Sequence, residues 1–120
     1  MSVVSTDNAE HYLWGDGCDG WHLLKDPSLS VIQERVPPGK SEQVHRHAVA
    51  RQFFYILEGR AEMRRADEVF VLSAGQGIEV PPGVPHQFCN PFECEVAFLV
   101  VSSPTTRGDR ENLLPAQSAG

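Results

Sequence analysis

Glycine and proline interrupt this chain at short intervals, and this spacing leaves no room for a long helix. Between the breaks lie short runs rich in β-branched and aromatic residues, a composition typical of strands. No interval holds about ten residues with the 3.6-residue periodicity of an amphipathic helix. Strands are predicted at 29–36, 52–57, 61–65, 69–72, 78–80, 86–89 and 96–101. Many short strands separated by turn residues predict an all-β sandwich or barrel.

The charge of the chain limits the partners of such a barrel. Its 120 residues include 10 Lys and Arg against 16 Asp and Glu, a net charge of −6 that repels nucleic-acid phosphates. No apolar run approaches the roughly 20 residues of a membrane span. Residues 1–10 are polar and acidic, without the apolar stretch of a secretory signal. We therefore expect a cytoplasmic protein that binds neither nucleic acid nor membrane.

The cysteines do not form a disulfide framework, because there are three of them. Cys89 and Cys94 flank residues 90–93, a predicted hairpin tip. They can form a disulfide bond across the hairpin, or both can stay reduced. A cytosolic location favours the reduced thiols. Cys18 lies in a Gly/Asp-rich stretch and is assigned no chemistry.

The predicted strand 52–57 is apolar on both faces. Its two faces carry Gln52, Phe54 and Ile56, and, opposite, Phe53, Tyr55 and Leu57. A barrel interior buries only one of these faces, so the other needs a cover. Either the N-terminal segment with Trp14, Trp21 and Leu23 or a second subunit can supply it. We therefore expect a homodimer.

Three histidines carry the strongest chemical signal. His45 and His47 are two residues apart, so on a strand both imidazoles point to one face. His86 follows a Pro-rich turn at 81–85 and is a third candidate. Three converging neutral imidazoles are a common site for Zn, Ni, Fe or Mn, and Gln52 can add an amide oxygen. The alternative is that these side chains are core residues without a metal.

Two motifs connect these histidines to a known family. The first runs through Gly39, His45, His47, Gln52 and Gly59, separated by five, one, four and six residues. The second runs through Gly75, Pro81, Gly83, His86 and Asn90, separated by five, one, two and three residues. Every spacing matches the cupin motifs, and the sequence resembles a small single-domain cupin over residues 1–120, with motifs at 39–59 and 75–90. One identity departs, since Gln52 stands where cupins usually have Glu.

This resemblance implies a double-stranded β-helix, the jelly-roll cupin barrel. It also implies a divalent transition metal (Zn, Ni, Mn or Fe) at one mouth of the barrel, held by His45, His47, Gln52 and His86. Small cupins with this ligand set are similar to enzymes that linearise unsaturated uronates and to certain polyketide cyclases. The uronate enzymes also use an acidic residue and an Arg near the last strand, whereas residues 100–104 carry no carboxylate.

The neutral side chain of Gln52 determines which type of metal chemistry we expect. A neutral amide leaves the full charge of a divalent ion, which favours Lewis-acid chemistry over oxidation of the metal. We expect a metal-dependent enzyme of isomerase, lyase or cyclase type that acts on a small oxygenated or carbohydrate-derived molecule. Phe54, Ile56 and Phe88 are possible pocket walls. No side chain is identified as a general acid or base.

Two alternatives remain open at this point. The first is a metal-containing barrel that binds or senses a small molecule without turnover, which the missing acid or base favours. The second is an iron or nickel dioxygenase, which the same ligands can serve.

Overall fold

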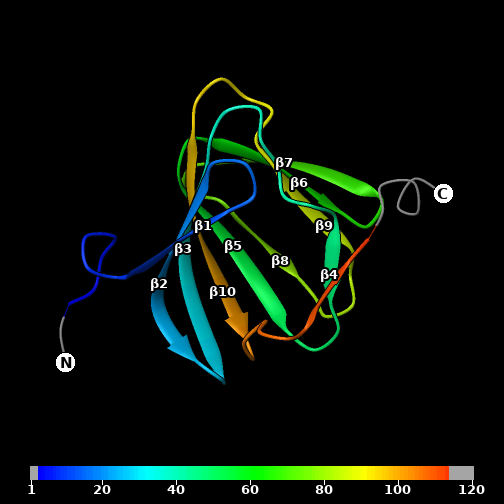
Figure 1. Cartoon of the computed structure of the whole chain (residues 1–120). Coiled ribbons are helices and arrows are strands. Elements are labelled where there is room, and N and C mark those ends of the chain that lie inside the picture. Colours follow the sequence, from blue (N-terminus) through cyan, green and yellow to red (C-terminus); the bar gives the residue numbers. More distant parts are fainter. Residues whose placement is uncertain (1–2, 114–120) are drawn as a thin grey trace.

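The computed structural model describes residues 3–113, and all its regular elements are strands (Figure 1). Their bounds are Glu10–Trp14 (β1), Cys18–Asp26 (β2), Leu29–Val36 (β3), His45–His47 (β4), Arg51–Glu58 (β5), Arg60–Arg65 (β6), Glu68–Ser73 (β7), Gly77–Val80 (β8), His86–Cys89 (β9), Val96–Ser103 (β10) and Arg110–Asn112 (β11). Every predicted strand is present, and β3 and β9 have the predicted bounds. The expected all-β class is confirmed.

Four further strands are present: β4, which carries the His-x-His pair, and β1, β2 and β11, which lie at or next to a sheet edge. β2 contains Gly20 and several polar or charged residues, so its composition does not indicate a strand. It is extended because it pairs antiparallel with β3, and β1 pairs with β2 in turn. β11 pairs with β4, with Arg110 opposite His47. Pairing with a neighbour, rather than composition, makes these segments strands.

Two antiparallel sheets face one another and enclose the core (Figure 1). The larger sheet has the order β1-β2-β3-β10-β5-β8, and the smaller has the order β11-β4-β9-β6-β7. Phe54 on β5 and Phe98 on β10 meet Phe88 on β9 between the sheets. The rings of Phe88 and Phe98 stack with centroids 3.9 Å apart. This arrangement is the jelly-roll cupin barrel that the resemblance implied.

The outer face of β5 is not covered by the N-terminal segment, so that expectation is wrong. β1 and β2 extend the larger sheet beyond β3 and do not fold back over β5. Trp14 instead packs against the core. Phe53, Tyr55 and Leu57 therefore stay 43%, 37% and 41% exposed. Of the two covers considered, only a second subunit remains.

Two motif residues fix tight turns. Gly59 has a φ of +84°, and a Cβ there would lie 2.5 Å from the Glu95 carbonyl oxygen. Asn90 is buried, and its Oδ1 accepts a hydrogen bond from the Phe92 backbone N–H at 3.1 Å, an Asx turn. These contacts give both residues a structural role.

The three cysteines are free, with Cys18 and Cys89 buried and Cys94 exposed. The residues described here, 3–113, form no helix with the length and hydropathy needed to span a membrane.

Candidate metal centre

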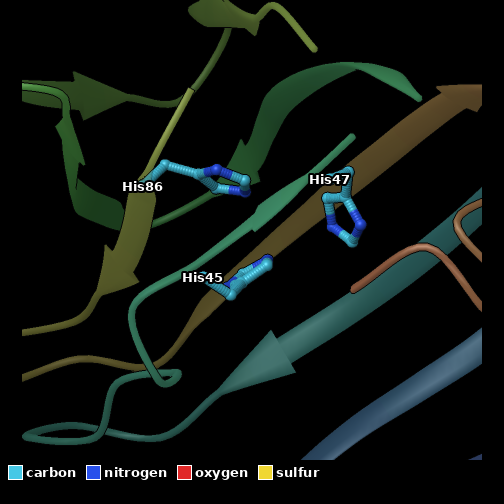
Figure 2. Close-up of side chains that lie close together, drawn as sticks. All are labelled: His45, His47 and His86. Atoms are coloured by element: carbon cyan, nitrogen blue, oxygen red, sulfur yellow. The ribbon is translucent and has the colours of Figure 1, made fainter. Parts of the chain in front are cut away.

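Two neighbouring strands bring the three histidines together (Figure 2). His45 and His47 lie on β4 and His86 on β9, where His45 is directly opposite His86. All three side chains are buried. One ring nitrogen from each residue lies within 4.8 Å of the others. The short strand β4 thus directs the imidazoles of His45 and His47 to one face, as the His-x-His spacing predicted, and there they meet the imidazole of His86.

Backbone carbonyls orient two of the rings. His45 Nδ1 is 2.8 Å from the Gln43 carbonyl oxygen, and His86 Nδ1 is 3.0 Å from the Val84 carbonyl oxygen. A ring whose Nδ1–H donates to a carbonyl keeps the lone pair of Nε2 for a ligand. Burial lowers the pKa of His45 to about 3 and the pKa of His86 to about 4. Both imidazoles are therefore neutral at neutral pH, the form that binds metals.

Several buried polar atoms in this group have no protein partner. Among the described residues, His47 Nδ1, His86 Nε2 and Gln52 Oε1 accept or donate no hydrogen bond. The Gln52 amide is oriented on β5, because its Nε2 donates to Ser102 Oγ at 3.2 Å. Buried polar atoms normally have partners, so this set indicates a ligand. Imidazole nitrogens with an amide oxygen fit a divalent transition metal.

Asp109 holds the segment that follows His47. Its carboxylate accepts hydrogen bonds from the backbone N–H groups of Ala48 at 3.0 Å, Val49 at 3.1 Å and Ala50 at 2.9 Å. These N–H groups lower the pKa of the Asp109 carboxyl. The segment before β11 thereby fixes the turn between the His47 and Gln52 strands.

His45 and His47 open onto a cavity of about 230 Å³ between the sheets, whereas His86 lies behind them and is not part of its lining. Its lining comprises Tyr12, Trp14, Ile32, Glu34, Glu42, His45, His47, Gln52, Phe54, Val100, Ser102, Thr106 and Arg110. Of the three predicted wall residues, Phe54 lines this cavity. Ile56 and Phe88 lie in the core, where Phe88 stacks on Phe98. The structure thus places His45, His47, Gln52 and Phe54 at one cavity.

One side of the cavity carries a Tyr–Glu pair that the sequence patterns did not identify. The Tyr12 hydroxyl on β1 donates a hydrogen bond to Glu34 Oε2 on β3, at 3.1 Å. Burial raises the pKa of the Glu34 carboxyl from 4.5 to about 7. Burial and the neighbouring Glu34 carboxylate raise the pKa of Tyr12 above its ordinary value. Near neutral pH the Tyr12 hydroxyl is therefore protonated, and the Glu34 carboxyl is protonated in a fraction of the molecules.

A second carboxyl, that of Glu42, is tied to the histidine strand. Its Oε1 accepts a hydrogen bond from the Phe88 backbone N–H at 2.9 Å and lies 4.0 Å from His45 Nδ1. Burial, with repulsion from Glu34, raises the pKa of Glu42 to about 8. Arg110 also lines the cavity, and its positive charge opposes these upward shifts at both carboxyls.

A sequence signal for Glu34 exists, whereas one for Tyr12 does not. In the predicted strand 29–36, Glu34 falls on the same face as Ile32 and Val36. A carboxylate at a core-facing position is an exception that indicates a site. Residues 10–14 were not predicted as a strand, so nothing in the pattern placed Tyr12 opposite Glu34.

The comparison with known families agrees with this geometry. A family model described as "Cupin domain" matches residues 32–102, more than half of the chain. The chain belongs to the cupin family, and its clustered His45, His47 and His86 are consistent with a metal site.

Individual relatives cover the chain to different extents. The chain is 31% identical over 111 residues to the uncharacterized protein MJ1618 of Methanocaldococcus jannaschii, across 87% of this chain and 89% of that protein. Polyketide synthase CurC of Streptomyces cyaneus is 34% identical over 67 residues, 56% of this chain and 44% of that protein. The match thus spans less than half the length of CurC.

Among solved structures, the polyketide cyclase RemF from Streptomyces resistomycificus matches with a TM-score of 0.82. The identity is 21%, with 95% of this chain and 86% of that chain covered. At this identity the likeness shows the fold alone.

Proposed function

We propose that this cupin is a metal-dependent enzyme that acts on a small oxygenated or carbohydrate-derived molecule by redox-neutral chemistry of isomerase, lyase or cyclase type. The observation that carries the proposal is the set of partnerless buried atoms, His47 Nδ1, His86 Nε2 and Gln52 Oε1, at the cavity that His47 and Gln52 line. His45, His47, His86 and Gln52 would hold the ion, either Zn, Ni, Mn or Fe. When bound, such an ion polarises a substrate oxygen as a Lewis acid.

The charge of the donor set supports redox-neutral chemistry. Burial keeps His45 and His86 neutral, and the Gln52 amide is neutral, so these side chains cancel none of the ion's positive charge. A site of this charge attracts substrate carboxylates or enolates. It also disfavours a trivalent state, since no ligand charge compensates for the added positive charge. This argument favours the isomerase, lyase or cyclase type over an iron or nickel dioxygenase.

The relatives support the same class without selecting a reaction. The similarity to a polyketide synthase protein is consistent with a cyclase within this class, and the fold shared with a polyketide cyclase agrees with a small enzyme barrel without naming its reaction. Residues 100–104, at the end of β10, carry no carboxylate, whereas the uronate-linearising cupins that the sequence resembles use an acidic residue near the last strand. That difference counts against a uronate substrate. A non-catalytic binding barrel is the alternative function, and it predicts metal and ligand binding without turnover.

Gln52→Glu tests the proposal. The change keeps the shape of the side chain but adds a negative charge beside the ion. Zinc affinity should therefore rise by about tenfold or more, because opposite charges attract strongly in a poorly solvated site. Turnover of anionic substrates should fall, because the added charge repels them. The measurements are zinc affinity by chelator competition and turnover on a panel of uronates, keto acids and polyphenols.

Gln76→Glu is the matched control. Gln76 lies in an exposed turn, where its Oε1 accepts the Ser73 N–H at 2.8 Å, a bond that a carboxylate keeps. This variant should match wild type in zinc affinity and turnover. Equal or higher redox-neutral turnover in Gln52→Glu would contradict the Lewis-acid argument. Ligand binding without turnover in every form would favour the binding barrel.

We also propose that the chain forms a homodimer through the outer face of the larger sheet. Phe53, Tyr55 and Leu57 on β5 are exposed there, and Leu99 and Val101 on β10 are their cross-strand neighbours. Adjacent strands thus present apolar side chains side by side on one face, and such exposed patches often mark interaction sites. A second copy presents the same apolar surface, so a two-fold axis can pair the two faces. The cytoplasmic location remains a prediction.

Phe53→Lys tests the dimer. A charge on both copies of the face should shift the protein from about twice the chain mass to the chain mass of 13.3 kDa in sedimentation equilibrium at micromolar concentration. Val71→Lys is the control, because Val71 is 55% exposed on the other sheet and should leave the dimer intact. Wild-type protein that sediments as a monomer would contradict the dimer.

A further inference from the structure

The Tyr12–Glu34 pair lies in the same cavity as the histidines but belongs to neither cupin motif. Glu34 lines the cavity together with His45, His47 and Gln52. The cavity of about 230 Å³ has room for a small organic molecule that touches both groups at once. A small molecule bound in this cavity would therefore lie beside His45, His47 and Glu34.

Glu34 has no structural partner that would explain its presence there. Among residues 3–113, its carboxyl pairs with no Lys, Arg or His, and its hydrogen bond comes from the Tyr12 hydroxyl. Asp109 shows the contrast, since its carboxylate ties three backbone N–H groups of one turn. The neighbouring inward positions on β3 carry Ile32 and Val36, so an apolar residue would suit the barrel as well. A half-buried carboxyl without a structural partner lowers the stability of the fold. A functional role would explain its presence here.

We propose that Glu34 is the residue that takes a proton from the substrate and returns it, with Tyr12 as a positioning residue that holds the carboxyl toward the cavity. This inference rests on the proposed redox-neutral function. The Glu34 carboxylate accepts a proton from a carbon next to a carbonyl, and the electron pair of that C–H bond moves toward the carbonyl oxygen. The resulting carboxylic acid returns the proton to another substrate atom or to a leaving group. No oxidant or co-reactant is needed.

The surroundings of Glu34 suit a group that exchanges a proton at neutral pH. The charged and titratable groups that act on it are Tyr12 on β1, Cys18 on β2, Glu42 before β4 and Arg110 on β11. Burial raises its pKa to about 7, while the Tyr12 hydrogen bond and the Arg110 charge limit the rise. A base is most effective when its pKa lies near the working pH.

The other groups in the cavity suit this role less well. Glu42 is engaged by the Phe88 backbone N–H and lies against His45. The raised pKa of Tyr12 keeps its hydroxyl protonated, so Tyr12 donates a hydrogen bond but does not act as a base. Glu34 is thus the carboxyl that is free to change its protonation state.

The first measurement follows the carboxyl itself and needs no substrate. Side-chain 13C NMR titration of the full chain, with and without zinc, gives the midpoint for Glu34, which Glu34→Gln assigns. We expect about 7 without zinc. Tyr12→Phe should raise the midpoint, because the hydrogen bond that stabilises the carboxylate is lost. A midpoint below 5 without zinc would overturn the inference, whatever the function of the protein.

The second measurement follows proton transfer. Zinc-loaded protein is incubated in D2O with dihydroxyacetone or pyruvate, and loss of the carbon-bound proton signal is recorded by NMR. Glu34→Gln should lower the protein-dependent exchange by about 100-fold or more at unchanged zinc content. Glu68→Gln, an exposed carboxyl at the start of β7, should exchange as wild type does. Tyr12→Phe should shift the pH midpoint of exchange upward, which a merely structural role would not do.

The outcomes separate the two proposals. Exchange that persists in Glu34→Gln at the wild-type rate would overturn the inference and leave the proposed function standing. Wild-type protein that exchanges neither probe and turns over nothing on the substrate panel would overturn both.

Discussion

The two sides of the cavity hold their polar groups in different ways. The histidine group (His45, His47 and His86) comes from two paired strands, and backbone carbonyls orient two of its rings. The Tyr12–Glu34 pair comes from β1 and β3 of the other sheet, and one side chain orients the other. The histidine group is thus fixed by the backbone, whereas the acidic side depends on one hydrogen bond between side chains.

Burial shifts both sides toward their neutral forms. It lowers the pKa of His45 to about 3, since a buried imidazolium is disfavoured, and raises the pKa of Glu34 to about 7, since a buried carboxylate is disfavoured. The same desolvation therefore leaves a lone pair available on the histidines and an exchangeable proton on Glu34. In the two proposals, the same desolvation thus serves a metal site on one side of the cavity and a proton-transfer site on the other.

The largest expected effect concerns the histidine group. His47→Ala removes one imidazole, so the protein should lose stoichiometric zinc after dialysis. Its thermal stabilisation by zinc, about 2.7 kcal/mol at a zinc concentration 100 times the Kd, should disappear with it. The measurements are elemental analysis and calorimetry with and without zinc.

His11→Ala is the control for this loss. His11 is exposed and bonded to Asp19 at 2.7 Å, outside the cavity lining, so its removal should not change zinc content. Equal zinc in His47→Ala and wild type would show that the three histidines are core residues.

A smaller effect is expected at the residue that orients Gln52. Ser102→Ala removes the hydroxyl that accepts the Gln52 Nε2 hydrogen bond, so the amide loses the contact that orients it. Zinc affinity should fall by about tenfold, as is common when a residue that orients a ligand is lost. Ser103→Ala, on the exposed face of the same strand, is the matched control. Unchanged affinity in chelator competition would argue that Gln52 does not bind the ion.

The smallest effect concerns stability on the acidic side. The pKa of Glu34 is raised on folding, so the native state holds this proton more tightly than the unfolded chain does. Its contribution is therefore present below pH 4.5 and is lost as the pH rises through about 7. Between pH 5 and 8, the unfolding free energy of metal-free wild type should fall by about 1–2 kcal/mol more than that of Glu34→Gln.

Urea denaturation at both pH values measures this difference. Glu68→Gln should follow the wild-type pH dependence, because Glu68 is exposed. If the unfolding free energies of wild type and Glu34→Gln changed with pH in the same way, Glu34 would be an ordinary, solvated carboxyl. The contrast with the histidine group would then not hold.

Much of the fold and the histidine group followed from local sequence. Turn glycines and prolines separated the strands of both sheets, and the spacing His45-x-His47 placed two imidazoles on one face. The strands β1 and β2 were not predicted, because pairing with a neighbour, and not their own composition, makes them extended. For residues 105–120 the sequence allowed one helical turn or a short strand; β11 is a short strand within this segment, and residues 114–120 lie outside the described residues.

The information read from the sequence is therefore local: alternation along a strand and the turns, to which the resemblance to the cupin motifs added that His86 joins His45 and His47. The tertiary structure alone decided that Tyr12 meets Glu34 across β1, β2 and β3, that Phe88 lies in the core, and that the outer face of β5 stays exposed. The physical reason is that strand periodicity assigns a residue to a face, whereas the opposing residue and the depth of burial depend on how distant strands pair. The desolvation of Glu34, which raises the pKa of its carboxyl, follows from that pairing.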